Sequence, residues 1–153
     1  LQPIFRGGAL RAEVRRNEAA QFQAIADYGA LSLRAFAEVE NALIEHKGVK
    51  AVAVLAVEDE MHDEEILACI VLMDGVSPLR ETAMDIQRAL VGRLSATKVP
   101  AWIAFKDELP VTGTQKVQKG SLFPNGQDPR SSPGSFDLRE EKRSLRSSDR
   151  ASR

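Results

Sequence analysis

Hydrophobic positions divide the middle of the chain into elements of two periodicities. Residues 36–46 carry apolar side chains at the spacing of an amphipathic helix, which Gly48 stops. Two apolar runs rich in β-branched residues follow, in residues 49–57 and 66–73, separated by the acidic stretch EDEMHDE. The short connection predicts two buried strands that pair antiparallel.

A second helix and a third strand come next. Ser77 and Pro78 supply an N-cap and a first-turn proline for a helix that is expected to end near Ser95. Its buried face is predicted at Leu79, Ala83, Ile86, Leu90 and Leu94. Residues 102–106 read as a strand, with Ile103 and Phe105 on one face and Trp102 and Ala104 on the other. This order predicts an α+β fold, a small and mainly antiparallel sheet of about three strands flanked by helices.

The two ends of the chain differ from this middle part. Residues 1–35 are predicted to be partly helical after the loop signal FRGG, and residues 36–123 form the main domain. Residues 124–153 combine prolines, serines and mixed charge with few apolar side chains, which is typical of a disordered tail. A chain that begins at Leu1 is expected to be part of a longer protein.

Composition excludes some classes of function. The formal net charge of -1 gives no basic footprint for nucleic acid, and the apolar runs are far shorter than the ~20 residues that a membrane span needs. Cys69 is the single cysteine, which predicts a reducing, cytoplasmic compartment and an inert core residue. The carboxylates around His62 are more typical of a solvated turn than of a metal site, so no metal ligands are predicted.

The stretch LPVTGTQKVQKGSLF, Leu109–Phe123, places a lysine within a loop signal. Pro110 and Gly113 punctuate the chain, so Lys116 is expected on a turn between elements. Its ammonium can act as a mobile charge for phosphate or carboxylate oxygens. For the loop taken alone, a merely solvated lysine is the commoner case.

Four segments together resemble the C-terminal domain of the adenylate-forming acyl-CoA synthetases. AEVENALIEHKGVKAVAVLAVEDE is similar to that family's pattern E-V-E-x-x-L-x-x-H-P-x-V-x-x-A-x-V, and EEILACIVLMDG is similar to its next strand. KVPAWIAFKDELPVTGTQKVQKGSL resembles the K-V-P segment with its strand and the motif D-x-L-P-x-T-x-x-G-K-[VI]-x-[KR]. The resemblance runs in one order over about residues 36–123.

The resemblance implies the small, mobile domain of an ATP-dependent ligase that joins a small carboxylic acid to coenzyme A. Its partner would be the N-terminal adenylation domain of the same enzyme, which would hold most of the contacts to ATP, coenzyme A and Mg²⁺. The acid attacks the α-phosphate of ATP to give an acyl-adenylate and pyrophosphate, and the sulfur of coenzyme A then displaces AMP. The chain alone is not expected to turn over.

The matching positions receive roles from the same resemblance. Lys116 is implied as the catalytic lysine, whose ammonium bridges the attacking carboxylate and the phosphate oxygens. The residues expected to shape and support its loop are Thr112, Gly113, Thr114 and Gln115.

Coenzyme A contacts are expected at two further positions. Arg34 lies in residues 31–35, where the resemblance implies a loop before the E-V-E helix. Lys119 is expected to cap or solvate the short helix after the lysine loop, with a contact to coenzyme A phosphates as the alternative.

Two departures from the family pattern keep other interpretations open. Gln115 stands where glycine usually precedes the lysine, and the hinge pattern D-R-x-K-[DE] is missing. The alternatives are a stand-alone interaction or regulatory module that binds a phosphorylated ligand, and an inactive ligase fragment. The form of the lysine loop and of the tail looks most like synthetases of the carnitine or crotonobetaine type.

Overall fold

A computed structural model describes residues 9–60, 63–114 and 116–151 of the chain. The chain divides into two compact units, Leu1–Ala35 and Phe36–Arg153. Helix α1 (Ala9–Ile44) supplies the described residues of the first unit and opens the second. The loop expected at residues 31–35 is therefore wrong, because this stretch continues α1 without a proline or glycine to end it. None of the helices in the described residues is long and apolar enough to cross a membrane.

The second unit is built on a four-stranded sheet in the order β1-β2-β3-β4. Strands β1 (Val49–Asp59) and β2 (Asp63–Leu72) pair antiparallel, as predicted, and β3 (Trp102–Phe105) runs parallel to β2. The parallel pairing follows from the long crossover through helix α2 (Arg80–Ala89). Strand β4 (Ser135–Asp137) pairs antiparallel with β3. The α+β class and the mainly antiparallel sheet are thus confirmed, with one strand more than predicted.

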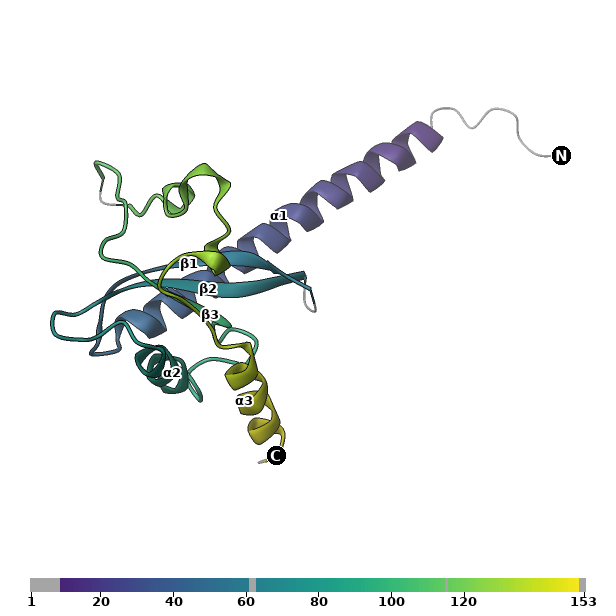
Figure 1. Cartoon of the computed structure of the whole chain (residues 1–153). Coiled ribbons are helices and arrows are strands. Elements are labelled where there is room, and N and C mark those ends of the chain that lie inside the picture. Colours follow the sequence, from purple (N-terminus) through teal and green to yellow (C-terminus); the bar gives the residue numbers. More distant parts are fainter. Residues whose placement is uncertain (1–8, 61–62, 115, 152–153) are drawn as a thin grey trace. The chain divides into compact units, whose positions relative to one another are not determined.

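Both faces of the sheet are covered. One face packs against the end of α1 and against α2, through a cluster that includes Leu43, Ile86 and Ile103. The other face packs under the segment that follows β3, through a cluster that includes Trp102 and Leu122. In Figure 1, α2 and the green segment after β3 lie on opposite sides of the sheet. The predicted facing of β3 is confirmed, because Ile103 and Phe105 belong to the first cluster and Trp102 and Ala104 to the second.

Helix α2 is shorter than its apolar periodicity predicts. It begins at Arg80, and its N-cap Leu79 has extended backbone angles (φ -104°, ψ 161°) without a side-chain cap bond. Ser77 therefore does not cap it; instead the Ser77 carbonyl accepts a hydrogen bond from the Thr82 hydroxyl at 2.8 Å. The helix ends before Gly92, whose φ of 81° belongs to the left-handed region.

The disordered tail predicted for residues 124–153 is wrong in the described residues. The tail contributes β4 to the open edge of β3 and forms helix α3 (Arg139–Ala151). Leu138 is fully buried in the first core cluster, and the Lys142 ammonium binds the buried Glu65 carboxylate at 2.5 Å. A few well-placed contacts thus order a segment whose composition resembles that of a disordered one.

Candidate functional site

The segment after β3 forms a narrow hairpin that carries the predicted lysine. The Gln118 amide donates to the Pro110 carbonyl at 2.8 Å, and Val111 and Val117 form an antiparallel bridge. The Thr112 amide then donates to the Lys116 carbonyl at 2.8 Å. The hydrogen bonds between these two short arms place Lys116 beside the turn of the hairpin.

The hydroxyl of Thr112 closes the turn. It accepts a hydrogen bond from the Lys116 amide at 3.1 Å and lies 2.9 Å from the Thr114 hydroxyl. Gly113 is exposed, with open space around the position that a side chain would take. The sequence-predicted residues Thr112, Thr114 and Lys116 are therefore brought together, whereas Gln115 lies outside the described residues.

Lys116 carries a solvent-exposed positive charge at this turn. Its side chain is exposed, and its ammonium makes no hydrogen bond or ion pair with any residue that the structure describes. An ammonium held on a closed turn and open to solvent can meet an anionic ligand without first leaving a protein partner.

Lys119, three positions further on, is placed quite differently. Its ammonium binds the Glu40 carboxylate at 2.7 Å and the Val54 carbonyl at 2.8 Å, and it lies 5.7 Å from the centre of the Phe36 ring. It starts the short helix η1 (Lys119–Ser121), but its side chain does not cap that helix, since it binds α1 and β1 instead. The two lysines of the motif therefore have different surroundings, one exposed and one bound to α1 and β1.

The other predicted residues lie in the other unit or outside the described residues. Arg34 is exposed on α1, within the unit Leu1–Ala35, whereas the hairpin belongs to the unit Phe36–Arg153. His62 and the FRGG stretch lie outside the described residues. Among the described residues, no group of three or more His, Cys, Asp or Glu could hold a metal ion.

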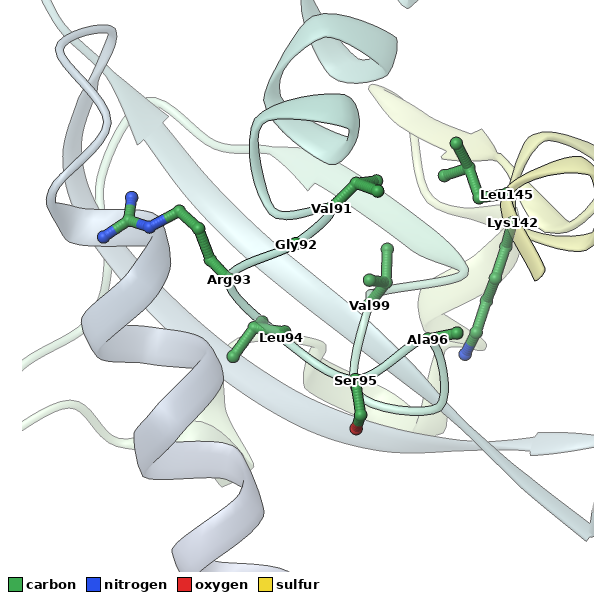
Figure 2. A pocket seen from close by; sticks show the side chains of 9 residues that line it. All are labelled: Val91, Gly92, Arg93, Leu94, Ser95, Ala96, Val99, Lys142 and Leu145. Atoms are coloured by element: carbon green, nitrogen blue, oxygen red, sulfur yellow. The ribbon is translucent and has the colours of Figure 1, made fainter. Parts of the chain in front are cut away.

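A pocket of about 410 Å³ lies between the loop after α2 and helix α3, and sequence reasoning missed it. Its lining residues are Val91, Gly92, Arg93, Leu94, Ser95, Ala96, Val99, Lys142 and Leu145. Figure 2 shows the Lys142 side chain reaching from α3 toward this loop, where its ammonium also donates to the Thr97 carbonyl at 3.2 Å. None of the predicted site residues lines this pocket, so it is separate from the lysine hairpin.

Comparison with known proteins decides the family. Residues 38–116 match the family described as AMP-binding enzyme C-terminal domain, which is more than half of the chain. The chain belongs to this family. The match ends at Lys116, so Lys119, β4 and α3 lie beyond it.

Relatives of this AMP-binding C-terminal domain are acyl-CoA ligases. The chain is 41% identical over 85 residues to 4-hydroxybutyrate--CoA ligase 1 of Metallosphaera sedula, which covers 56% of this chain and 15% of that ligase. A crystal structure of Brucella canis acyl-CoA synthetase superposes with a TM-score of 0.54 at 33% identity, over 56% of this chain and 16% of the other.

A second solved relative contains a reaction intermediate. The o-succinylbenzoate CoA synthetase of Bacillus subtilis, in complex with the acyl-adenylate intermediate OSB-AMP, superposes with a TM-score of 0.51 at 28% identity. That alignment covers 61% of this chain and 18% of the synthetase. The chain thus spans less than a fifth of the relatives that it matches.

Proposed function

We propose that this domain works within an ATP-dependent ligase that joins a small carboxylic acid to coenzyme A, and that Lys116 serves acyl-adenylate formation. The observation that carries the proposal is the exposed Lys116 ammonium, which has no partner among the described residues, at the last position of the family match. The domain supplies the lysine, and an adenylation domain in the complete ligase supplies the binding sites for the acid and for ATP.

The chemistry requires a positive charge at this step. Attack of a carboxylate oxygen on the α-phosphorus forms a new P–O bond while the bond to pyrophosphate breaks, so two anions must approach each other. An ammonium between the carboxylate and the phosphate oxygens lowers this repulsion and stabilises the transition-state charge. At about 4 Å and an effective dielectric constant near 20, one such charge pair is worth roughly 4 kcal/mol.

The closed turn explains why a loop residue can do this. The Thr112 hydroxyl and the paired arms of the hairpin fix the backbone on which Lys116 stands, so only the lysine side chain must be ordered when the substrates bind. The flexible stem of the lysine then adjusts its ammonium to the reacting oxygens.

The test uses the complete ligase in which this chain occurs. Lys116→Ala is expected to lower acyl-adenylate formation by about 10² to 10³, measured as acid-dependent pyrophosphate release. Short acids such as 4-hydroxybutyrate, the acid named for the Metallosphaera sedula relative, form the first substrate panel. Thioester formation from supplied acyl-adenylate and coenzyme A should stay within about twofold, because that step no longer brings a carboxylate to ATP.

Two controls accompany the Lys116→Ala measurement. Lys47→Ala removes another exposed lysine of the same unit and should leave both half-reactions unchanged. The 153-residue chain alone should form no acyl-CoA. An equal loss of both half-reactions in Lys116→Ala would remove the role proposed for this lysine.

A further inference from the structure

Strand β1 lies at one edge of the sheet, and one residue on its open side is bound by two charged side chains. The Val54 amide donates to Glu40 Oε1 at 2.9 Å, and the Val54 carbonyl accepts from Lys119 Nζ at 2.8 Å. Edge strands carry unpaired amides and carbonyls that need partners outside the sheet. Glu40 and Lys119 provide those partners at Val54.

The two side chains also bind each other. Lys119 Nζ lies 2.7 Å from Glu40 Oε1, although the residues are 79 positions apart in the sequence. The Phe36 ring lies 5.7 Å from the same ammonium, within the range of a cation–π contact. We call this arrangement of Glu40, Val54 and Lys119 the edge clamp.

The edge clamp holds one end of the lysine hairpin. Lys119 directly follows Gln118, which closes the base of the hairpin on Pro110. Because the end of α1 covers one face of the sheet and the hairpin segment covers the other, Lys119 reaches around the open edge of β1 to join the two layers. The backbone that carries Lys116 is thereby tied to α1.

A separate contact holds the opposite end. The Lys106 ammonium lies 4.3 Å from the centre of the Phe123 ring and donates to the Ser132 hydroxyl at 3.1 Å. Lys106 is the residue after β3, so the segment between it and Phe123 is fastened at both ends while Lys116 stays exposed.

We propose that Glu40 and Lys119 are positioning residues, which set the place of the Lys116 ammonium for acyl-adenylate formation through the edge clamp. This inference rests on the function proposed above for Lys116. Neither residue is proposed to touch substrate, since the carboxylate and the ammonium bind each other and Val54. The edge clamp does not contact the Lys116 side chain. It acts on Lys116 through the backbone of the hairpin.

Because the Glu40–Lys119 pair is partly exposed, its effect on the rate can be measured apart from its effect on folding. The side chains of Lys119 and Glu40 are 38% and 30% exposed, and ion pairs of this kind contribute little to global stability. Loss of the clamp is therefore expected to leave the domain folded while the hairpin samples positions in which Lys116 misses the reacting oxygens.

The decisive variant is Lys119→Met in the complete ligase, which keeps the length of the side chain and removes its charge. Acyl-adenylate formation is expected to fall about tenfold in kcat, the effect of losing a charge-assisted hydrogen bond, with the KM for ATP changed less than about twofold. Thioester formation from supplied acyl-adenylate should be unchanged. Lys119→Arg keeps the charge and the donors and should recover most of the lost rate.

The same helix offers a matched control. Lys98 forms an ion pair with Glu38, two positions before Glu40, but Lys98 lies before β3 and outside the hairpin. Lys98→Met should therefore leave the rate of adenylation unchanged and show a thermal midpoint similar to that of Lys119→Met.

Each outcome separates the two proposals. The clamp proposal is wrong if Lys119→Met keeps its adenylation rate, or if Lys98→Met loses as much of that rate. It is also wrong if Lys119→Met slows both half-reactions, or if Lys119→Arg recovers none of the lost rate. Lys116→Ala runs in parallel. If that variant keeps its adenylation rate, the function proposed for Lys116 fails and the clamp proposal falls with it; if only Lys119→Met keeps its rate, the clamp proposal alone is wrong.

Discussion

Cys69 lies in β2 with no exposed surface, among the residues of the second core cluster. Burial raises the pKa of its thiol to about 11, against a smaller opposing effect of Lys106 and Lys119. A thiol at this pKa carries almost no thiolate near neutral pH, and the thiolate is the nucleophilic form. Cys69 is thus a packing residue, as its place in an apolar run predicts.

Because Cys69 is the single cysteine, its labelling by a thiol reagent reports this burial directly. At pH 8 the folded chain should react at least about a hundredfold more slowly with iodoacetamide than the chain in denaturant, followed by mass spectrometry. Because burial disfavours the thiolate, ionisation favours the unfolded chain, so the stability is unaffected below the ordinary pKa of 9.0 and falls as the pH rises toward 11. Equal labelling rates in the two states would contradict this assignment.

Lys116 and Lys119 show how far single residues can be interpreted from sequence. The motif places both in one short stretch, and the loop signals around Pro110 and Gly113 are enough to predict a turn at Lys116. What distinguishes them is Glu40, which lies 79 positions before Lys119 and pairs with it across the edge of the sheet. No local pattern contains that contact, so sequence reasoning could not separate an exposed lysine from a clamped one.

Between neighbouring elements, Asp137 joins the end of β4 to the start of α3. Its carboxylate accepts from the Arg139 amide at 3.0 Å and pairs with the Arg139 guanidinium at 2.8 Å. Burial opposes ionisation of Asp137, but the hydrogen bonds from Arg139 together outweigh it and hold its pKa below the ordinary value. Arg139 also binds Asp59 at 3.0 Å and lies over the Trp102 ring, so this junction is tied to the sheet.

Asp137→Asn tests this junction through its pH dependence. A lowered carboxyl pKa contributes stability above the unfolded value of about 3.9 and loses it as the pH falls through the folded value. The variant should be less stable at pH 7, by no more than about 1 kcal/mol because the pair is partly exposed, and the difference from the parent should be smaller at pH 2.

The readout is the thermal midpoint at the two pH values. Asp85→Asn is the matched control, because Asp85 pairs with Arg88 on the exposed surface of α2 and should change stability little at either pH. A destabilisation of Asp137→Asn that persists unchanged at pH 2 would mean that the charge of the carboxylate is not the cause.

The elements that sequence patterns predict are the ones with long apolar runs. Strands β1 and β2 contain enough buried positions to stand out, and β3 is recognised by its alternation. Strand β4 has only three residues, with Phe136 as its single apolar one, and it exists because β3 leaves an edge open. This pairing depends on the open edge of β3, which lies far away in the sequence. The composition of the segment alone therefore predicts disorder.

For the whole unit Phe36–Arg153, the C-terminal residues are part of the core. Leu138 has no exposed surface, and its carbonyl accepts from the side chain of the buried Gln87 on α2 at 3.2 Å. Lys142, which is 3% exposed, holds the Glu65 carboxylate inside the protein. Residues beyond the family match therefore help to hold the sheet on which the lysine hairpin stands.

Ending the chain at Phe123 tests this conclusion, because it removes β4, Leu138 and Lys142 together. A lost buried leucine costs about 2–5 kcal/mol, and a buried carboxylate left without its partner costs about 3–5 kcal/mol. Their sum approaches the whole stability of a typical domain, about 5–15 kcal/mol, so the shortened chain should be largely unfolded. Urea unfolding followed by the fluorescence of Trp102, the single tryptophan, measures the change.

Two point variants show whether the packing of single side chains causes this loss of stability. Leu138→Ala should lower the free energy of unfolding by about 2–5 kcal/mol, since it opens a cavity in the first core cluster. Glu140→Ala, at an exposed position two residues later, should change it by less than about 0.5 kcal/mol. If the shortened chain has the same urea midpoint as the parent, the C-terminal segment does not stabilise the domain. The fold would then depend on residues 36–123 alone.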